Sequence, residues 1–235
     1  RSISAEMERA QRQFESMRLG NAGTLTIGSS PIGEPNIIPR AIEIFMKERS
    51  NFRLIIADDG ASELTAALAR GDIDMNLGAL WDNEANPELI QEVLFQDRMV
   101  AVARSGHPLA AKKELRHDQA LDYGWIMPPA DLRLRLLIEN TFRQLNCSLP
   151  PKIIECTPYA TVRNLVHAGD WLATLPLQSV ANDIRAGTLA VLNLDLKVPR
   201  RPIGIITHAS SAPSSDLLNF IECLKAAVAE LELAL

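Results

Sequence analysis

The spacing of hydrophobic residues changes repeatedly between two periods along most of the chain. Apolar residues alternate in residues 24–29, and they then recur every three or four positions in residues 39–49, where Ile42 and Phe45 continue a stripe that starts at Ile38. A period near two is typical of a strand and a period near 3.6 is typical of an amphipathic helix. We therefore predict a strand followed by a helix, and this pair is the first of several.

The same alternation predicts an α/β fold built from two similar halves. Further strands are expected at residues 52–57, 73–77, 94–104, 123–127, 152–155, 171–175, 188–192 and 202–207, and further helices at 62–70, 134–145, 161–168 and 215–235. Interleaved strands and helices favour a parallel sheet with helices on its faces. The pattern restarts after strand 94–104, which indicates two halves joined by crossing strands that form a hinge. Ligands of such folds bind at the carboxyl ends of the strands, in the crevice between the halves.

The first segment of the chain has a different period. Its apolar residues are separated by alternating steps of four and three, as in a heptad seam: Ile3, Met7, Ala10, Phe14 and Met17. Charged and amide residues fill the intervening positions, so we interpret the segment as the end of a coiled coil that stops at Gly20. A short surface helix packed on its own domain is the alternative.

Composition narrows the functional classes. The 235-residue chain is 47% hydrophobic and 23% charged and has a net charge of -5, which argues against a nucleic-acid-binding surface within it. No apolar run is long enough to span a bilayer and the N-terminus has no signal-peptide core, so we expect a cytoplasmic protein without membrane contact. Cys147, Cys156, Cys223 and the scattered histidines show no metal or redox spacing, so we expect reduced thiols, no metal and no cofactor.

The turn after the first predicted strand is the leading candidate for ligand binding. Ser29, Ser30 and Gly33 lie where a strand passes into a helix, and unpaired N–H groups together with the helix dipole favour an anion there. The glycines of this turn do not match a dinucleotide fingerprint. A plain turn is the alternative interpretation. Trp81 follows the third predicted strand and is expected either to line the crevice or to cap the sheet.

No catalytic set is apparent in the sequence. Asp58-Asp59 is interpreted as a strand end and helix cap, and Asp72 and Asp74 as the polar face of the third strand or its entry. The serines of the first turn lack the G-x-S-x-G elbow of hydrolases. We therefore predict that the chain is not an enzyme. Trp125 and Trp171 each begin an apolar strand, and both are expected in the core.

The second half offers a charged group at the corresponding place. The Pro128-Pro129 pair ends strand 123–127, and the residues after it take the place that Ser29 and Ser30 have in the first half. Arg133 or Arg135 is a candidate charge partner for an anionic ligand, and Arg133 is our choice. The alternative is a proline-terminated strand followed by a helix cap, with Arg133 pointing to solvent.

The order and spacing of several motifs resemble the effector-binding region of LysR-type transcriptional regulators. The matching stretches are GNAGTLTIGSSP, IIPRAIEIFMKERSNFRLII, LTAALARGDIDMNLGAL, VLFQDRMVAVARSGHPLA, LVHAGDWLATLPLQSVA and RPIGIITHA. The resemblance implies two Rossmann-like subdomains of the periplasmic-binding-protein type II class. It places the end of the linker helix at residues 1–21, subdomain I at 22–97 plus 208–235, and subdomain II at 98–207.

The resemblance also implies where an effector binds. The implied ligand residues, at strand ends and in the turns that follow them, are Ser29, Ser30, Gly33, Leu80, Trp81, Pro129, Ala130, Asp131, Thr157 and Tyr159, to which the charge argument adds Arg133. No basic residue stands at the ends of the first and third strands. An acid therefore depends on hydroxyls, helix N-termini or an arginine of subdomain II. The stretch 125–129 resembles a branch that senses small carboxylates or sugar-derived acids.

Partners follow from the same resemblance. It predicts a small-molecule effector, a homodimer formed by the effector domain, a tetramer of the full-length protein, and promoter DNA bound only through an N-terminal helix-turn-helix domain absent from this sequence. In the family, the first helix of subdomain I packs against a subdomain II helix of a second copy. A periplasmic-type solute-binding protein for a small organic anion is the alternative, and an enzyme on this fold would need a catalytic set.

Overall fold

The protein is described from a computed structural model. The structure describes residues 23–29, 35–47, 49, 51–80, 87–194, 196–209 and 213–232. The predicted coiled coil of residues 1–21 lies outside the described residues, and so do Ser30, Gly33 and Trp81.

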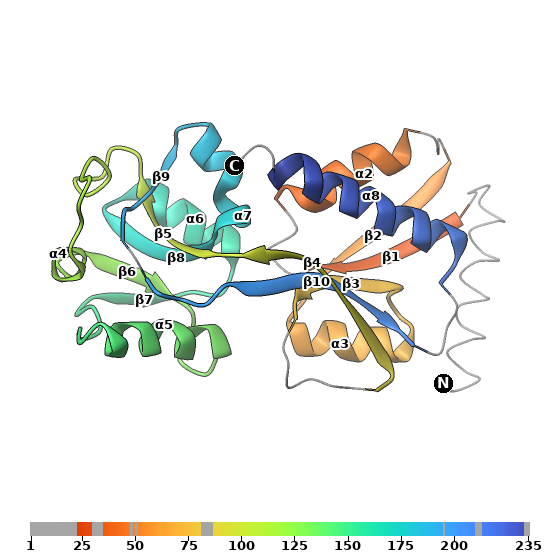
Figure 1. Ribbon diagram of the computed structural model, residues 1–235, viewed down its shortest axis with the longest axis horizontal. Coiled ribbons are helices and arrows are strands. Elements are labelled where there is room, and N and C mark those ends of the chain that lie inside the picture. Colours follow the sequence, from red (N-terminus) through yellow and green to blue (C-terminus); the bar gives the residue numbers. More distant parts are fainter. Residues whose placement is uncertain are drawn as a thin grey trace. The chain divides into compact units, whose positions relative to one another are not determined.

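The chain folds as two compact units, each with its own five-stranded sheet (Figure 1). The first unit ends at Gln96 and resumes at Arg201, and the second runs from Asp97 to Arg200. The strand order is β2-β1-β3-β10-β4 in the first sheet and β7-β6-β8-β5-β9 in the second. These two sheets with their helices confirm the predicted α/β fold class.

The first unit contains the elements β1 (Gly23–Ser29), α2 (Ile37–Met46), β2 (Phe52–Asp58), α3 (Ala61–Arg70), β3 (Met75–Ala79), β4 (Leu89–Asp97), β10 (Arg201–His208) and α8 (Ser215–Glu232). β1 runs parallel to β2 and β3, whereas β10 runs antiparallel to β3 with Ile205 opposite Leu77. The sequence-based boundaries assign strand 202–207 to subdomain II, but its pairing places it in the first sheet. Periodicity identifies a strand without selecting its partner, because pairing depends on contacts that are remote in sequence.

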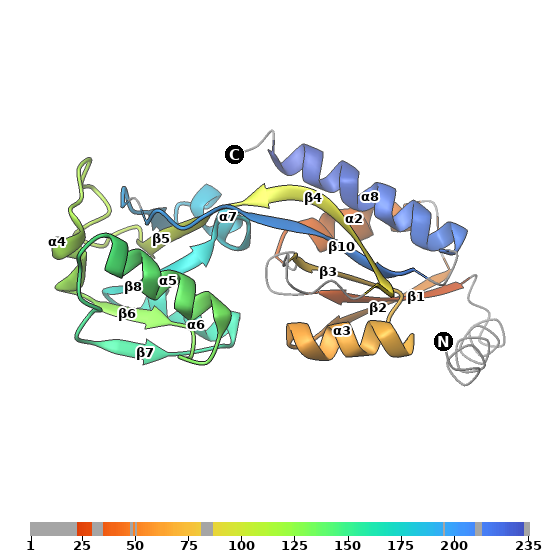
Figure 2. The ribbon, with the colours of Figure 1, turned by 60° about the horizontal axis from the view of Figure 1, so that its bottom comes forward.

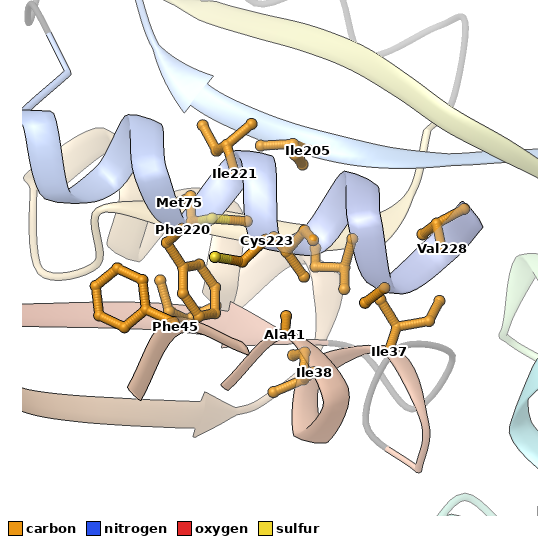
Figure 3. Close-up of a cluster of buried hydrophobic side chains, with 14 of the residues drawn as sticks. Ile37, Ile38, Ala41, Phe45, Met75, Ile205, Phe220, Ile221, Cys223 and Val228 are labelled. Carbon is orange, nitrogen blue, oxygen red and sulfur yellow. The ribbon is translucent and has the colours of Figure 1, made fainter. Parts of the chain in front are cut away.

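Helices cover both faces of the first sheet: α2 and α8 lie side by side on one face, and α3 lies on the other (Figures 1 and 2). The ring of Phe45 on α2 meets the ring of Phe220 on α8 edge-on, with 5.4 Å between centroids, and meets Phe52 of β2 at 5.1 Å. Figure 3 shows Phe45 and Phe220 among the buried side chains of this layer. Burying one side chain of this size contributes about 1.5–3 kcal/mol, so apolar contact is the main link between α2 and α8.

Gly71, Asp72 and Asp74 define the turn between α3 and β3. Gly71 has a φ of 80° and ends α3, in a conformation that glycine adopts without strain. The N–H of Asp72 donates to Ala67 O at 2.9 Å. Asp74 Oδ2 accepts from the N–H of Thr26 at 2.9 Å and so ties the turn to β1. Asp72 and Asp74 therefore act at the entry to the strand, as one of their two predicted interpretations states.

The second unit contains the elements β5 (Met99–Arg104), α4 (His117–Leu121), β6 (Gly124–Met127), α5 (Arg133–Gln144), β7 (Ile153–Glu155), α6 (Tyr159–Ala168), β8 (Trp171–Pro176), α7 (Leu177–Arg185) and β9 (Leu189–Val191). The single strand predicted at 94–104 is divided at Arg98 into β4 and β5, which belong to different sheets. Two helices are not predicted from the sequence: α4, which has only five residues and is too short to show a helical period, and α7, whose nine residues directly follow β8.

Two tryptophans of the second unit have different surroundings. Trp125 is completely buried, its Nε1 donates to Ala120 O at 3.0 Å, and its ring meets Phe142 edge-on at 5.4 Å. Trp171 is only half-buried, and its ring lies against Gly124, where a Cβ atom would come within 2.3 Å of the indole. Trp125 is therefore a core residue as predicted, whereas Trp171 packs at the border of the core.

Candidate functional site

The parallel strands of the first sheet end next to one another. Ser29, the last residue of β1, is in register with Asp58 of β2 and with Leu77 of β3. Ser29 is completely buried, whereas Asp58 is exposed. Leu80 follows β3 and packs with Leu64 in the layer beneath α3. Of the ligand residues predicted in this unit, the two that the structure describes, Ser29 and Leu80, are both buried.

A buried amide of the third strand lies close to this edge. Asn76 of β3 is in register with Gly28 of β1 and Ile206 of β10, and it is 5% exposed. Its Oδ1 has no hydrogen-bond partner in the described part of the chain. Because helices cover both faces of this sheet, the alternation of polar and apolar residues along β3 does not report exposure. Burial of an unpaired carbonyl oxygen costs about 1–3 kcal/mol.

The ligand residues predicted in the second unit follow two adjacent strands. β6 and β7 run parallel, and their last residues, Met127 and Glu155, are in register. After these strands, Pro129 and Tyr159 are half-buried, and Ala130, Asp131, Arg133 and Thr157 are exposed. The structure therefore brings the residues that follow β6 and those that follow β7 to the carboxyl edge of one parallel strand pair.

Two arginines at the start of α5 differ in their surroundings. Arg133 is exposed, whereas the side chain of Arg135 is only 6% exposed. Arg135 Nε donates to Glu139 Oε1 at 2.8 Å, and its Nη1 donates to Glu155 Oε1 at 3.1 Å and to Pro128 O at 2.9 Å. Arg135 is thus engaged within the unit, and the guanidinium of Arg133 is the more accessible one.

Polar contacts join α6 to α7 along three successive turns. The hydroxyl of Tyr159 donates to Ser179 O. Arg163 binds both oxygens of the Asp183 carboxylate, with Nε at 2.7 Å from Oδ2, and His167 Nε2 lies 3.4 Å from Oδ1 of the same group. We call these five residues the α6–α7 ladder.

Three members of the ladder have shifted pKa values. The hydrogen bond to Asp183 raises the pKa of the Arg163 guanidinium. Burial raises the pKa of the Tyr159 hydroxyl. Burial also opposes ionisation of Asp183, but the hydrogen bonds and charge of Arg163 outweigh it and hold the pKa of this carboxyl below its usual range. Tyr159, one of the predicted ligand residues, keeps its proton and donates a hydrogen bond to Ser179 O within the unit. The spacing of four residues from 159 to 163 to 167 is a signal of a shared helix face that the sequence analysis did not use.

The described residues contain no arrangement typical of a metal site: no three His, Cys, Asp or Glu groups are placed to hold an ion within the described ranges. The three cysteines all lie in described ranges and none forms a disulfide. Among the helices that the structure describes, none has the length and apolar character needed to cross a membrane.

The chain is similar in sequence to transcriptional regulators. It is 28% identical over 208 residues to the HTH-type transcriptional regulator GalR of Pseudomonas putida, a match that covers 88% of this chain and 52% of the relative. It is 25% identical over 205 residues to the uncharacterized HTH-type transcriptional regulator YdcI of Escherichia coli, covering 87% of this chain and 66% of the relative. The chain therefore spans about half to two thirds of the length of these relatives.

Solved structures share the fold. The BenM effector binding domain with its effector benzoate has a TM-score of 0.70 at 22% identity and is matched over 90% of this chain and 95% of that chain. The CcmR regulatory domain of Synechocystis in complex with 2-PG has a TM-score of 0.72 at 18% identity, over 88% of this chain and 97% of that chain. An OxyR mutant of Corynebacterium glutamicum has a TM-score of 0.71 at 25% identity, over 97% and 73%. The shared fold is the periplasmic-binding-protein type II fold.

A family model described as the LysR substrate binding domain matches residues 18–229. This match extends over both units and over each of the motifs on which the resemblance rests. The similar proteins of known name are transcriptional regulators, so the solute-binding alternative is not favoured. The chain belongs to the LysR substrate binding domain family.

Proposed function

We propose that the chain is the effector-sensing domain of a LysR-type transcriptional regulator. The observation that carries the proposal is the family match over residues 18–229, in a chain whose relatives are named transcriptional regulators. In this proposal a helix-turn-helix domain of the full-length protein binds promoter DNA, the regulator acts in the cytoplasm, and the chain itself catalyses no reaction. The effector changes DNA binding through a coupling free energy of about 1–3 kcal/mol.

The proposed effector is a small acidic or sugar-derived molecule. Benzoate and 2-PG are bound by two proteins of the same fold. The proposed ligand residues are Ser29, Ser30, Gly33, Leu80 and Trp81, together with Pro129, Ala130, Asp131, Arg133, Thr157 and Tyr159, which follow β6 and β7 of the second unit. Exposed Arg133 and Thr157 support the proposal most directly, because a ligand reaches them without displacing core residues.

A melting experiment tests the effector part of the proposal. The chain is heated with a library of small acids, sugars and sugar acids, and a ligand at about one hundred times its Kd adds roughly 2.7 kcal/mol to stability. Arg133→Ala and Thr157→Ala should reduce this shift when it is measured from each variant's own ligand-free melting temperature. Arg143→Ala is the matched control, since Arg143 is an exposed arginine of the same helix. A library without any stabilising compound contradicts the proposal.

A footprinting experiment tests the regulatory part. With the full-length regulator on its promoter, the effector found in the melting screen should change the footprint or the bend of the DNA. A tightly bound effector that alters neither the footprint, the bend nor the affinity for DNA would show that the domain does not act as a transcriptional switch.

We further propose a homodimer through the effector domain, with α2 in the contact, and a tetramer of the full-length protein. Ile44 lies half-buried on α2 beside exposed Glu43. Ile44→Glu should shift the chain toward monomer in sedimentation velocity, because a carboxylate at an apolar contact opposes association. Leu218→Glu on α8 is the control, since Leu218 is also apolar and 50% exposed. A wild-type chain that is monomeric at high concentration contradicts the dimer.

A further inference from the structure

An ion cluster at the carboxyl edge of β6 and β7 bears on the chemistry of the effector. It consists of Arg135, Glu139 and Glu155, with the carbonyl of Pro128 as a further acceptor of the guanidinium. The buried guanidinium contacts two carboxylates at 2.8 and 3.1 Å. Arg143 Nη2 lies 3.9 Å from Glu139 Oε2, so Glu139 faces two guanidinium groups, whereas Glu155 pairs with Arg135. Nε and Nη1 of Arg135 are both engaged within the unit.

The two carboxylates of the cluster occupy different positions. Glu139 lies one turn further along the same helix as Arg135, and its side chain is 23% exposed. Glu155 is the last residue of β7, next to Met127 at the end of β6, and its side chain is 49% exposed. Figures 1 and 2 both show α5 running beside β6 and β7, so the arginine reaches the strand ends from the helix.

Arg135 fixes the direction of the Glu155 carboxylate. One nitrogen, Nη1, donates both to Glu155 Oε1 and to the Pro128 carbonyl that directly follows β6. The same strand ends are tied by the N–H of Cys156, which donates to Met127 O at 3.0 Å. Glu155 is thus a solvent-accessible acceptor held in place by a buried donor, two residues before Thr157. An oriented group of this kind binds a ligand without first losing rotamer freedom.

We infer that Glu155, positioned by Arg135, is a specificity-determining residue, and that the effector presents a hydroxyl or ammonium donor to the end of β7 and directs any carboxylate elsewhere. The inference rests on the proposed effector function. An ionised carboxylate only accepts hydrogen bonds, and its bonds to O–H or N–H donors are stronger than neutral ones. A ligand carboxylate at the same place would face a negative group, which selects against it.

Matched pairs of probes test this inference on the 235-residue chain. Carboxylates without hydroxyl groups, benzoate and butyrate, are compared with their hydroxylated forms, hydroxybenzoates and hydroxybutyrates, by isothermal titration. In the wild-type chain the hydroxylated member of at least one pair should bind about tenfold more tightly, which corresponds to one charge-assisted hydrogen bond. Glu155→Gln should reduce that preference to about twofold or less.

Glu139→Gln is the matched control, because it removes the same charge from the same arginine without touching the strand end. It should keep the preference for hydroxylated probes. Arg135→Met should lose the preference and Arg135→Lys should restore part of it, since lysine keeps one donor for Glu155. Selectivity is the decisive readout, because a merely structural ion pair would change the melting temperature of both glutamate variants and the selectivity of neither.

Three results would overturn the inference. One is equal binding of both members of every pair by the wild-type chain. Another is an equal loss of selectivity in Glu139→Gln and Glu155→Gln. A third is the absence of binding by all probes and by the wider melting library, which would overturn the effector function as well and so is distinguishable from the first two.

Discussion

The two units hold their helices together with different chemistry. In the first unit, α2 and α8 meet through buried apolar side chains, with Phe45 and Phe220 at the centre. In the second, α6 and α7 also contribute apolar side chains to one buried cluster, but the α6–α7 ladder adds directional bonds, in which Arg163 binds the buried carboxylate of Asp183. Apolar contact is non-directional, whereas hydrogen bonds and ion pairs define a geometry and depend on protonation. The ladder begins at Tyr159, so the directional bonds lie next to the edge proposed for the effector.

Each unit has an ion pair between two of its helices, and the burial of the pair determines how much it contributes to stability. Arg40 of α2 binds Glu230 of α8 at 2.6 Å, but both side chains are substantially open to solvent. Exposed pairs contribute about 0–1 kcal/mol. The side chain of Asp183 is 4% exposed, so loss of its partner leaves a carboxylate that water does not reach.

The largest expected effect comes from removing an aromatic ring in each unit. Phe45→Ala should destabilise the first unit, and Phe142→Ala the second, each by about 3–5 kcal/mol, because each leaves a cavity in a closed apolar layer. Native-state hydrogen exchange should show faster exchange mainly in the unit that carries the substitution. Equal loss of protection in both units after either substitution would mean that the units unfold together. The stability of one unit could then not be assigned to its own contacts.

The ladder should respond more strongly than the exposed pair of the first unit. Arg163→Gln should cost about 1–3 kcal/mol, because Asp183 then retains only weaker neutral partners and His167. Arg163 is itself 43% exposed, which limits the loss. Arg40→Gln, the control, should cost less than about 1 kcal/mol. Urea unfolding measures both, and equal costs would contradict the distinction between buried and exposed pairs.

Acid should weaken the second unit through two groups. His107 is buried, its Nδ1 accepts from the N–H of Leu109 at 3.1 Å, and burial lowers its pKa, with Asp170 opposing and Arg104 reinforcing the shift. The unfolded chain therefore takes up the proton first, so stability falls as the pH drops below about 6.5. The lowered pKa of Asp183 adds a second loss, which begins near a pH of about 4 and continues through its folded pKa.

A variant separates these two losses. His107→Asn keeps an acceptor for Leu109 but does not titrate, so the loss that begins near a pH of about 6.5 should disappear and the one that begins near about 4 should remain. Unfolding midpoints in urea across this range are the measurement. A wild-type chain whose stability is flat between a pH of about 7 and 5 would contradict the assignment to His107.

The smallest effect, and one of opposite sign, is expected in the layer beneath α3. Asn76→Val removes the unpaired Oδ1 from an apolar environment and should leave stability unchanged or raise it by up to about 1 kcal/mol. Asn76→Asp should instead destabilise the unit, since a carboxylate would be buried there. Thermal melts of the two variants measure both signs. A clear loss of stability in Asn76→Val would show that the amide has a structural partner.

Local features of the fold could be predicted from the sequence because their causes are local. The periodicity of residues 24–29 and 52–57 identifies β1 and β2, and Gly71 ends α3 where its conformational freedom predicts a stop. The family resemblance, based on the order of several motifs, is confirmed by the family match. The predicted ligand residues remain a proposal.

Other features depend on contacts that no local pattern encodes. The partner of β10 belongs to a sheet formed from distant segments of the chain. The unit that contains β10 could therefore not be inferred from its place in the sequence. The burial of Asn76 follows from a helix on each face of β3. Arg133 and Arg135 are both candidates in the sequence, with Arg133 preferred. Only the fold brings the ends of β6 and β7 to Arg135, whose guanidinium they bind. The sequence by itself determined the types of element and the family, since these rest on short-range periodicity and motif order. The tertiary structure alone decided which charges are neutralised and which stay accessible, because electrostatic partners are set by proximity in space.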